Sequence, residues 1–91
     1  MEWTKHALSR SRQRGITQKM VKVVHCYGSN SYANGASVIT MDREAINTYL
    51  TNEPNTSKQL VDKVLDLVLI TIDEVLVTVY RKGTGFKRKF K

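Results

Sequence analysis

The chain has 91 residues, a formal net charge of +7 and a hydrophobic content of 41%. This length allows one domain with a small core and leaves no room for a second. Cys26 is the only cysteine, which excludes an intrachain disulfide and a cysteine metal cluster. No apolar run is long enough to cross a bilayer, and the first residues lack the apolar segment of a secretory signal. We therefore expect a cytoplasmic protein without a membrane segment.

The positive charge is concentrated towards both ends of the sequence. Residues 1–28 carry six Lys or Arg against one Glu, residues 29–79 carry three against seven carboxylates, and residues 80–91 carry six and no acid. If the two ends meet in the fold, they form one positive face suited to phosphate groups. A general solubilising excess of charge explains the composition equally well, so charge alone does not establish nucleic-acid binding.

The first two predicted elements are helices. Apolar residues at helical spacing predict one helix over residues 4–14 and another over residues 18–27. Gly15 follows the first helix, where a positive φ costs glycine little. Thr17 is a suitable N-cap for the second helix, so the two are expected to be separate.

Two hairpins are expected further along the chain. Asn34 followed by Gly35 is the strongest hairpin turn signal in the sequence. The Val-, Ile- and Thr-rich runs near the C-terminus suit the centre of an antiparallel sheet. We therefore expect four strands, over residues 30–33, 36–41, 67–72 and 75–80.

Two short helices are predicted between these hairpins. Asp42 is a suitable N-cap for the first, and either Thr56 or Ser57 for the second, and the polar run around Pro54 separates the two helices. Together the elements predict an α+β fold, with a small antiparallel sheet, helices mainly on one face, and the N-terminal helix beside the last strand. We expect residues 1–82 to form a single domain and residues 83–91 to form a flexible basic tail.

Both ends of the chain carry a motif. The first, H-A-x-x-R-x-x-x-R-G-I-[ST], comprises His6, Ala7, Arg10, Arg14, Gly15, Ile16 and Thr17. The second is a final strand that reads Val77-Thr78-Val79-Tyr80-Arg81. Together they resemble a family of small bacterial proteins of unknown function that is related to the RelE and BrnT ribonuclease toxins of toxin–antitoxin systems. The resemblance implies a RelE/BrnT-toxin-like fold, RNA as the substrate, and an acidic antitoxin-like protein as a partner.

The resemblance also implies a site, at His6, Arg10, Arg14, Tyr80 and Arg81. The first three residues repeat every four positions, so they share one side of a helix. RNA cleavage without a metal needs a group that exchanges protons near neutral pH, and histidine is suited to this role. It also needs cations for the charge that develops on the phosphorus oxygens, which arginine supplies. No metal or cofactor is expected.

Each candidate residue also has a purely structural interpretation. His6 is in that case a packed, hydrogen-bonding residue on the flank of the helix, and Tyr80 is part of the core. The two helix arginines are then paired with carboxylates that hold the helix on the sheet. Examples of such carboxylates are Asp62, Asp66 and Glu74.

Further contacts with nucleic acid are predicted outside this site. Arg12 is expected to face solvent on the first helix, where it can contact phosphate. In the tail, aromatic and basic residues alternate, which combines base stacking with phosphate neutralisation. These tail residues are Phe86, Lys87, Arg88, Lys89 and Phe90. A solvated terminus without a binding role explains the same composition.

The leading hypothesis from the sequence is a toxin-like protein that interacts with RNA and cleaves it without a metal. A second hypothesis is a non-catalytic interaction module, such as a mobile-element accessory protein, whose basic face binds nucleic acid or an acidic partner protein. A third is a homodimer or larger homo-oligomer that associates through a self-complementary sheet edge or helix face. The sequence leaves open whether the protein is an enzyme.

Overall fold

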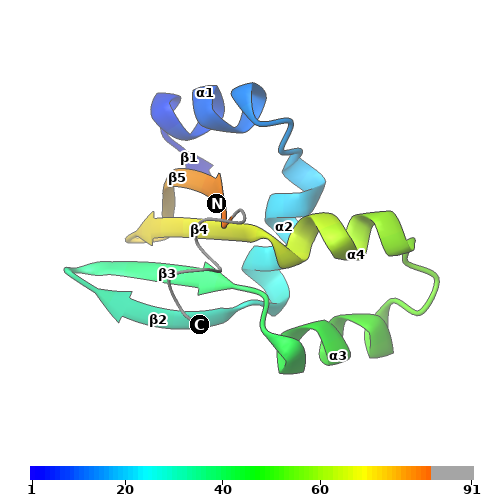
Figure 1. Cartoon of the computed structure of the whole chain (residues 1–91). Coiled ribbons are helices and arrows are strands. Elements are labelled where there is room, and N and C mark those ends of the chain that lie inside the picture. Colours follow the sequence, from blue (N-terminus) through cyan, green and yellow to red (C-terminus); the bar gives the residue numbers. More distant parts are fainter. Residues whose placement is uncertain (83–91) are drawn as a thin grey trace.

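The computed structural model describes residues 1–82, in which helices pack against one sheet (Figure 1). The two predicted N-terminal helices and the four predicted strands lie within one residue of their observed bounds, and the two later helices begin directly after Asp42 and Ser57. In chain order the elements are β1 (Glu2–Trp3), α1 (Lys5–Gln13), α2 (Gln18–Tyr27), β2 (Ser29–Ala33), β3 (Ala36–Thr40), α3 (Arg43–Asn52), α4 (Lys58–Leu65), β4 (Leu67–Ile72) and β5 (Val75–Arg81).

The described residues form a five-stranded sheet with the order β1-β5-β4-β3-β2. The pairs β2–β3, β3–β4 and β4–β5 are antiparallel, whereas β1 pairs with β5 in parallel. The predicted α+β class is therefore confirmed, but the sheet is mixed and the predicted purely antiparallel sheet is wrong. The sequence did not indicate β1, because a strand of two residues is too short to show an alternating pattern.

Two-residue turns close both hairpins. Asn34 and Gly35 have φ angles of 53° and 78°, and Asp73 and Glu74 have φ angles of 50° and 67°. Positive φ at both central residues is the geometry whose twist matches that of the flanking strands. The predicted Asn-Gly turn is confirmed, and the second hairpin adopts the same turn without a glycine.

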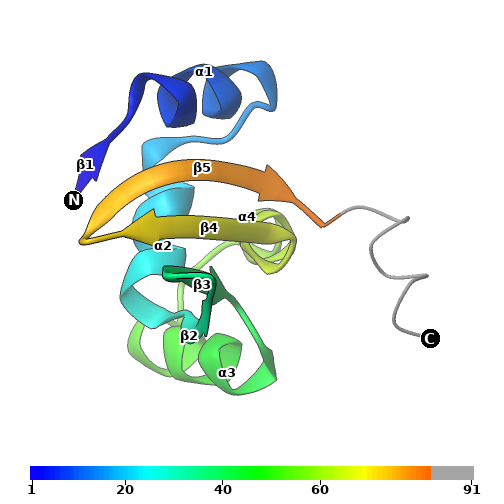
Figure 2. The ribbon, with the colours of Figure 1, turned by 90° about the vertical axis from the view of Figure 1, so that its left-hand side faces the viewer.

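The core lies between the sheet and the helices. Helix α2 packs against β3 and β4, and α3 and α4 pack against α2. Figures 1 and 2 show these three helices on the same side of the sheet, while α1 lies along β5. The central buried side chains come from every layer and include Ala7, Met20, Val21, Val24, Met41, Tyr49, Val64, Leu67, Leu69, Leu76 and Val79.

A glycine allows α2 to approach the sheet closely. Gly28 connects α2 to β2, and a Cβ atom at this position would collide with the carbonyl oxygen of Val24. The same Cβ would lie 2.6 Å from Cγ2 of Ile39 and 3.0 Å from the carbonyl oxygen of Thr40. The close packing of α2 on β3 therefore requires a residue without a side chain.

Candidate nucleic-acid interface

Thr4 fixes the start of α1 on strand β5. Its Oγ1 accepts a hydrogen bond from the N–H of Ala7 at 3.0 Å, which makes it the N-cap of the helix. The same hydroxyl donates to the carbonyl oxygen of Val77 at 2.9 Å, and the N–H of Thr4 donates to the carbonyl oxygen of Leu76 at 3.0 Å. The prediction that the N-terminal helix lies beside the last strand is thus confirmed.

The end of α1 is fixed by a glycine motif. Gly15 has a φ of 64°, and its N–H donates to the carbonyl oxygen of Arg12 at 3.4 Å. The N–H of Ile16 donates to the carbonyl oxygen of Ser11 at 2.8 Å, and the Ile16 side chain is buried. These two bonds and the buried residue after the glycine form a Schellman motif. Both ends of α1 are therefore fixed, which orients the basic side chains between them.

His6 and Arg10 lie together on α1. Nε of Arg10 donates to Nε2 of His6 at 3.4 Å, as the spacing of four residues predicts. His6 is exposed and Arg10 is half-buried, so the pair lies at the boundary between α1 and solvent. In this contact Nε2 of His6 is the acceptor, so the pair joins a ring nitrogen to a guanidinium.

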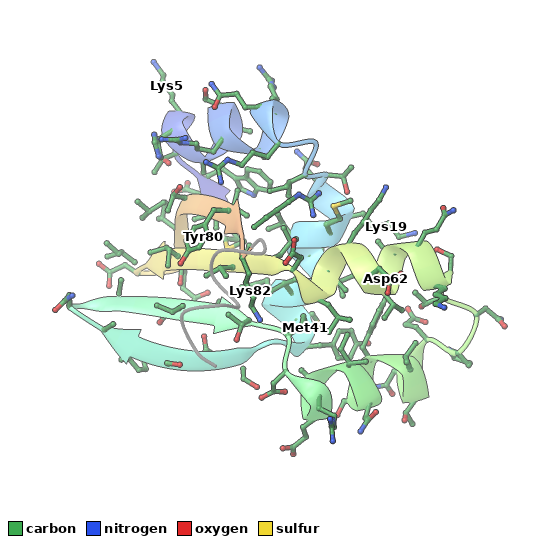
Figure 3. The ribbon with its side chains drawn as sticks, in the orientation of Figure 1. Lys5, Lys19, Met41, Asp62, Tyr80 and Lys82 are labelled. Atoms are coloured by element: carbon green, nitrogen blue, oxygen red, sulfur yellow. The ribbon has the colours of Figure 1, made fainter. Side chains whose placement is uncertain are left out.

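The other two arginines of this segment face solvent. Arg12 and Arg14 are both exposed, and Lys5 points away from the strands (Figure 3). Within residues 1–82 neither Arg10 nor Arg14 makes an ion pair with a carboxylate. Of the acids expected as their partners, Glu74 instead lies 4.0 Å from Nε2 of His25 on α2. The positive charge of α1 is thus not neutralised by ion pairs within this part of the chain.

Tyr80 and Arg81 are divided between the two faces of the sheet. Tyr80 lies opposite Val68 and Arg81 lies opposite Leu67, and successive residues of a strand point to opposite faces. Leu67 belongs to the core, so Tyr80 points to the other face; Figure 3 shows it beside the strands. Both side chains are half-buried, and within residues 1–82 no hydrogen bond joins either of them to the His6–Arg10 pair.

The remaining predicted contacts are not described by the structure. Phe86, Lys87, Arg88, Lys89 and Phe90 lie outside the described residues. Among residues 1–82, no three His, Cys, Asp or Glu side chains are close enough together to hold a metal ion. In the same part of the chain no helix is long and apolar enough to span a membrane.

A pocket between α2, α3 and α4 was not predicted from the sequence. It has a volume of about 450 Å³ and includes Lys19, Tyr49 and Ser57 in its lining. The sequence indicates Tyr49 only as part of an apolar helix face and Ser57 only as a helix cap. Neither pattern reveals that the two residues border the same space, because this depends on how α3 and α4 meet.

Comparisons with known proteins do not assign this chain to a family. It matches no protein-family model, no curated protein and no solved structure. The resemblance to small relatives of the RelE and BrnT toxins, carried by the motifs at the two ends of the chain, therefore stays a prediction.

Proposed function

We propose that this protein is a toxin-like, cytoplasmic RNA-binding protein with a RelE/BrnT-like fold that cleaves RNA without a metal ion. Its site comprises His6, Arg10 and Arg14 on α1, together with Tyr80 and Arg81 on β5. An acidic antitoxin-like protein is the expected partner, since a basic surface that binds RNA is most simply blocked by an acidic one.

The His6–Arg10 pair carries this proposal. It places a nitrogen that can accept a proton beside a guanidinium that can bind a phosphate oxygen. At 3.4 Å the bond between the two side chains is long, so a phosphate can replace His6 as the partner of Arg10 at little cost. His6 is then free to act on the sugar next to that phosphate.

The reaction that fits these groups is transfer of the phosphate to the neighbouring 2′ oxygen. His6 takes the proton of the 2′ hydroxyl while that oxygen forms a bond to phosphorus. The bond from phosphorus to the 5′ oxygen breaks, and the leaving oxygen takes a proton from the imidazolium or from water. Arg10 and Arg14 stabilise the negative charge on the phosphorus oxygens, and Tyr80 and Arg81, on opposite faces of β5, contact other parts of the bound RNA. The products are a 2′,3′-cyclic phosphate and a 5′ hydroxyl.

RNA cleavage by purified variants tests the proposal. His6→Ala should reduce the cleavage rate by about 10² to 10⁴-fold, the usual contribution of a general base. Arg10→Ala should reduce it by about 10²-fold, because one of the groups that stabilise the transition state is lost. Lys5→Ala is the matched control, since it removes an exposed positive charge from the same helix without touching the pair. Activity should persist in the presence of a metal chelator.

Circular dichroism and thermal unfolding should show that all variants remain folded. If the wild-type protein leaves RNA intact, or if His6→Ala cleaves as fast as Lys5→Ala, the catalytic role of His6 is wrong.

A second function, binding without catalysis, is favoured by the position of Tyr80. Tyr80 points to the face of the sheet opposite the core, and no hydrogen bond within residues 1–82 connects it to His6. A basic helix without a complete set of catalytic groups acts as an interaction module for nucleic acid or for an acidic protein. Such a module should bind RNA with an affinity that falls steeply with salt, and each of Arg10→Ala and Arg14→Ala should reduce that slope by about 1.

A further inference from the structure

The pocket between α2, α3 and α4 has the volume of a small-molecule site and a lining of both polar and apolar residues. Its volume of about 450 Å³ lies within the range of ligand pockets, roughly 300–1,000 Å³. Pro54 and Leu60 supply apolar surface, and Lys19, Glu53 and Ser57 supply polar groups. It shares no lining residue with α1, so it is independent of the proposed RNA site.

Tyr49 is a buried residue whose hydroxyl has no hydrogen-bond partner among residues 1–82. Only 3% of this residue is exposed, and its ring packs on Tyr27 with a distance of 5.1 Å between ring centroids. Within residues 1–82 the Tyr49 hydroxyl makes no hydrogen bond. Its oxygen is not fully enclosed, because no fully enclosed side-chain nitrogen or oxygen in this part of the chain lacks a partner. Tyr49 also lines the pocket, so its unpaired hydroxyl is the polar group of this residue that a ligand in the pocket can engage.

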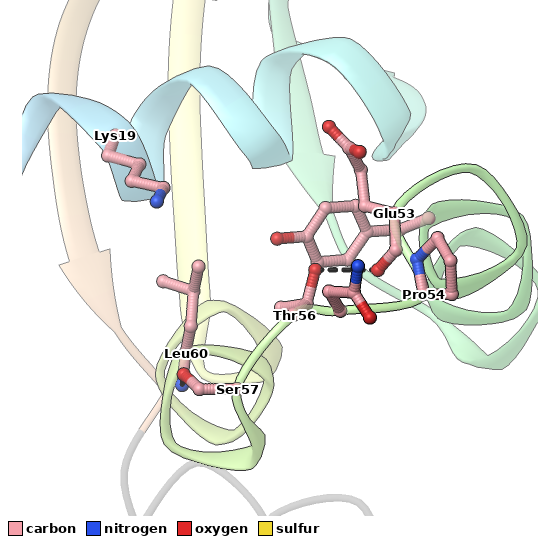
Figure 4. A pocket seen from close by; sticks show the side chains of 8 residues that line it. Lys19, Glu53, Pro54, Thr56, Ser57 and Leu60 are labelled. Carbon is pink, nitrogen blue, oxygen red and sulfur yellow. Dashed lines mark hydrogen bonds between the residues drawn. The ribbon is translucent and has the colours of Figure 1, made fainter.

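Two further groups give this part of the pocket a positive character. Lys19 of α2 lines it, and Figure 4 shows Lys19 on the side opposite Glu53. Ser57, which caps α4, also lines the pocket and accepts a hydrogen bond from the N–H of Leu60 at 3.2 Å. The N-terminus of α4 therefore borders the pocket, and a helix N-terminus carries partial positive charge.

We propose that this pocket binds a small organic molecule with a single carboxylate and an apolar body. The carboxylate accepts hydrogen bonds from Lys19 and from the Tyr49 hydroxyl, and the apolar body packs on Leu60, Pro54 and the Tyr49 ring. The carboxylate of Glu53 disfavours a ligand with two negative charges, because like charges in one pocket repel each other. Because Lys19 lies on the side opposite Glu53, the carboxylate of the ligand binds at the Lys19 side, and Glu53 repels a phosphate dianion more strongly than a monocarboxylate.

Titration of the full chain with benzoate, followed by amide chemical shifts in NMR spectra, tests the proposal. Benzoate should produce saturable shifts at residues 53–60 and around Lys19. Tyr49→Phe keeps the ring and removes the hydroxyl, and Lys19→Gln removes the charge; each should weaken binding by about tenfold or more, the effect of losing one hydrogen bond to a charged group. Lys22→Gln is the matched control, because it removes an exposed lysine of α2 that does not line this pocket.

Benzamide tests whether the ligand needs a negative charge, and inorganic phosphate tests the preference for a monocarboxylate. Benzamide has the shape of benzoate without its charge, so it should bind far more weakly, and phosphate should cause no saturable shifts in the pocket. The proposal is wrong if benzoate gives no saturable shifts there, if Lys19→Gln binds benzoate like Lys22→Gln, or if phosphate binds more tightly than benzoate. Lys19 is exposed, so its replacement does not endanger folding.

Discussion

The turn between β4 and β5 holds two residues in a conformation that suits glycine. Asp73 and Glu74 have φ angles of 50° and 67°, in the left-handed region. This conformation costs a residue with a side chain about 1–2 kcal/mol, and less for Asp, whose short side chain bonds locally. The ion pair between Glu74 and His25 offsets little of this conformational cost, because the paired atoms are 4.0 Å apart and the Glu74 side chain is 87% exposed.

We therefore expect Glu74→Gly to stabilise the protein. Glycine adopts the left-handed conformation without steric strain, and Asp-Gly is a preferred sequence for this turn. The strain energy that is removed should exceed the entropic cost of glycine, so the free energy of unfolding should rise by about 1 kcal/mol. Urea unfolding measures the difference. Glu74→Gln is the control, because it removes the charge and keeps the strained backbone, and it should change stability little. A loss of stability in Glu74→Gly would show that contacts of the Glu74 side chain outweigh the strain.

At the scale of elements, Asp42 joins a helix to a strand. Its Oδ1 accepts a hydrogen bond from the N–H of Ala45 at 2.8 Å, so it caps α3. Its Oδ2 accepts a hydrogen bond from Oγ of Ser29, the first residue of β2, at 2.7 Å. The bond from Ala45, followed by the bond from Ser29, lowers the pKa of this carboxyl, because both stabilise the charged form.

This lowered pKa predicts a pH dependence of stability. The contribution of the Asp42 charge is fully present above the pKa of the unfolded chain, about 3.9, and is lost as the pH falls through the lower pKa of the folded state. Asp42→Asn keeps an oxygen that caps α3 but has no charge. Its melting temperature should be lower than that of the wild type at pH 7, and the two melting temperatures should converge as the pH falls below about 3.9.

Asp42→Ala provides the comparison for the cap itself. It loses the acceptor for Ala45 at every pH, so it should melt below Asp42→Asn under both conditions. A difference between wild type and Asp42→Asn that stays constant with pH would contradict the role given to the charge.

At the scale of the whole molecule, the two edges of the sheet differ. Strand β1 and helix α1 occupy the outer side of β5, whereas within residues 1–82 no strand pairs with the outer side of β2. All five residues of β2 are exposed, and none of them is charged or proline. Natural proteins usually protect such edges with charge, proline or a covering segment. We therefore propose that two copies of the protein associate through this edge. In the dimer, β2 of one copy pairs antiparallel with β2 of the other, centred on Ser31.

Ser31→Lys tests this mode of association. A lysine at the centre of β2 would place two positive charges next to each other in the dimer, so we expect a concentration-dependent dimer of the wild type to become monomeric. Sedimentation velocity over a range of concentrations measures the change. Thr51→Lys adds the same charge to the exposed side of α3 and should leave association unchanged. If both variants sediment like the wild type, β2 is not the interface.

The features that depend on neighbouring residues could be predicted from the sequence. Thr17, Asp42 and Ser57 each accept a hydrogen bond from the N–H three residues later, as expected of N-caps. The spacing of His6 and Arg10 likewise predicted that the two side chains meet. In each case the energy comes from groups a few residues apart, so the local sequence is sufficient.

The features that depend on distant residues could not be predicted. Strand β1 exists because Glu2 and Trp3 lie beside Val75 and Leu76, which no pattern in so short a segment reveals. Alternation along β5 separates Tyr80 from Arg81, but which of the two faces meets the core depends on how the helices pack on the sheet. The pocket at Tyr49 arises where three helices meet, so it is determined by packing rather than by a motif.

The bond between Thr4 and Val77 also has a consequence for the newly made chain. The two residues are separated by 73 positions, so β5 must leave the ribosome before α1 has a strand on which to dock. Until then α1 is a helix of nine residues without tertiary support, and isolated helices of this length are marginal in water. The docked position of α1 on the sheet is thus acquired only after the synthesis of β5.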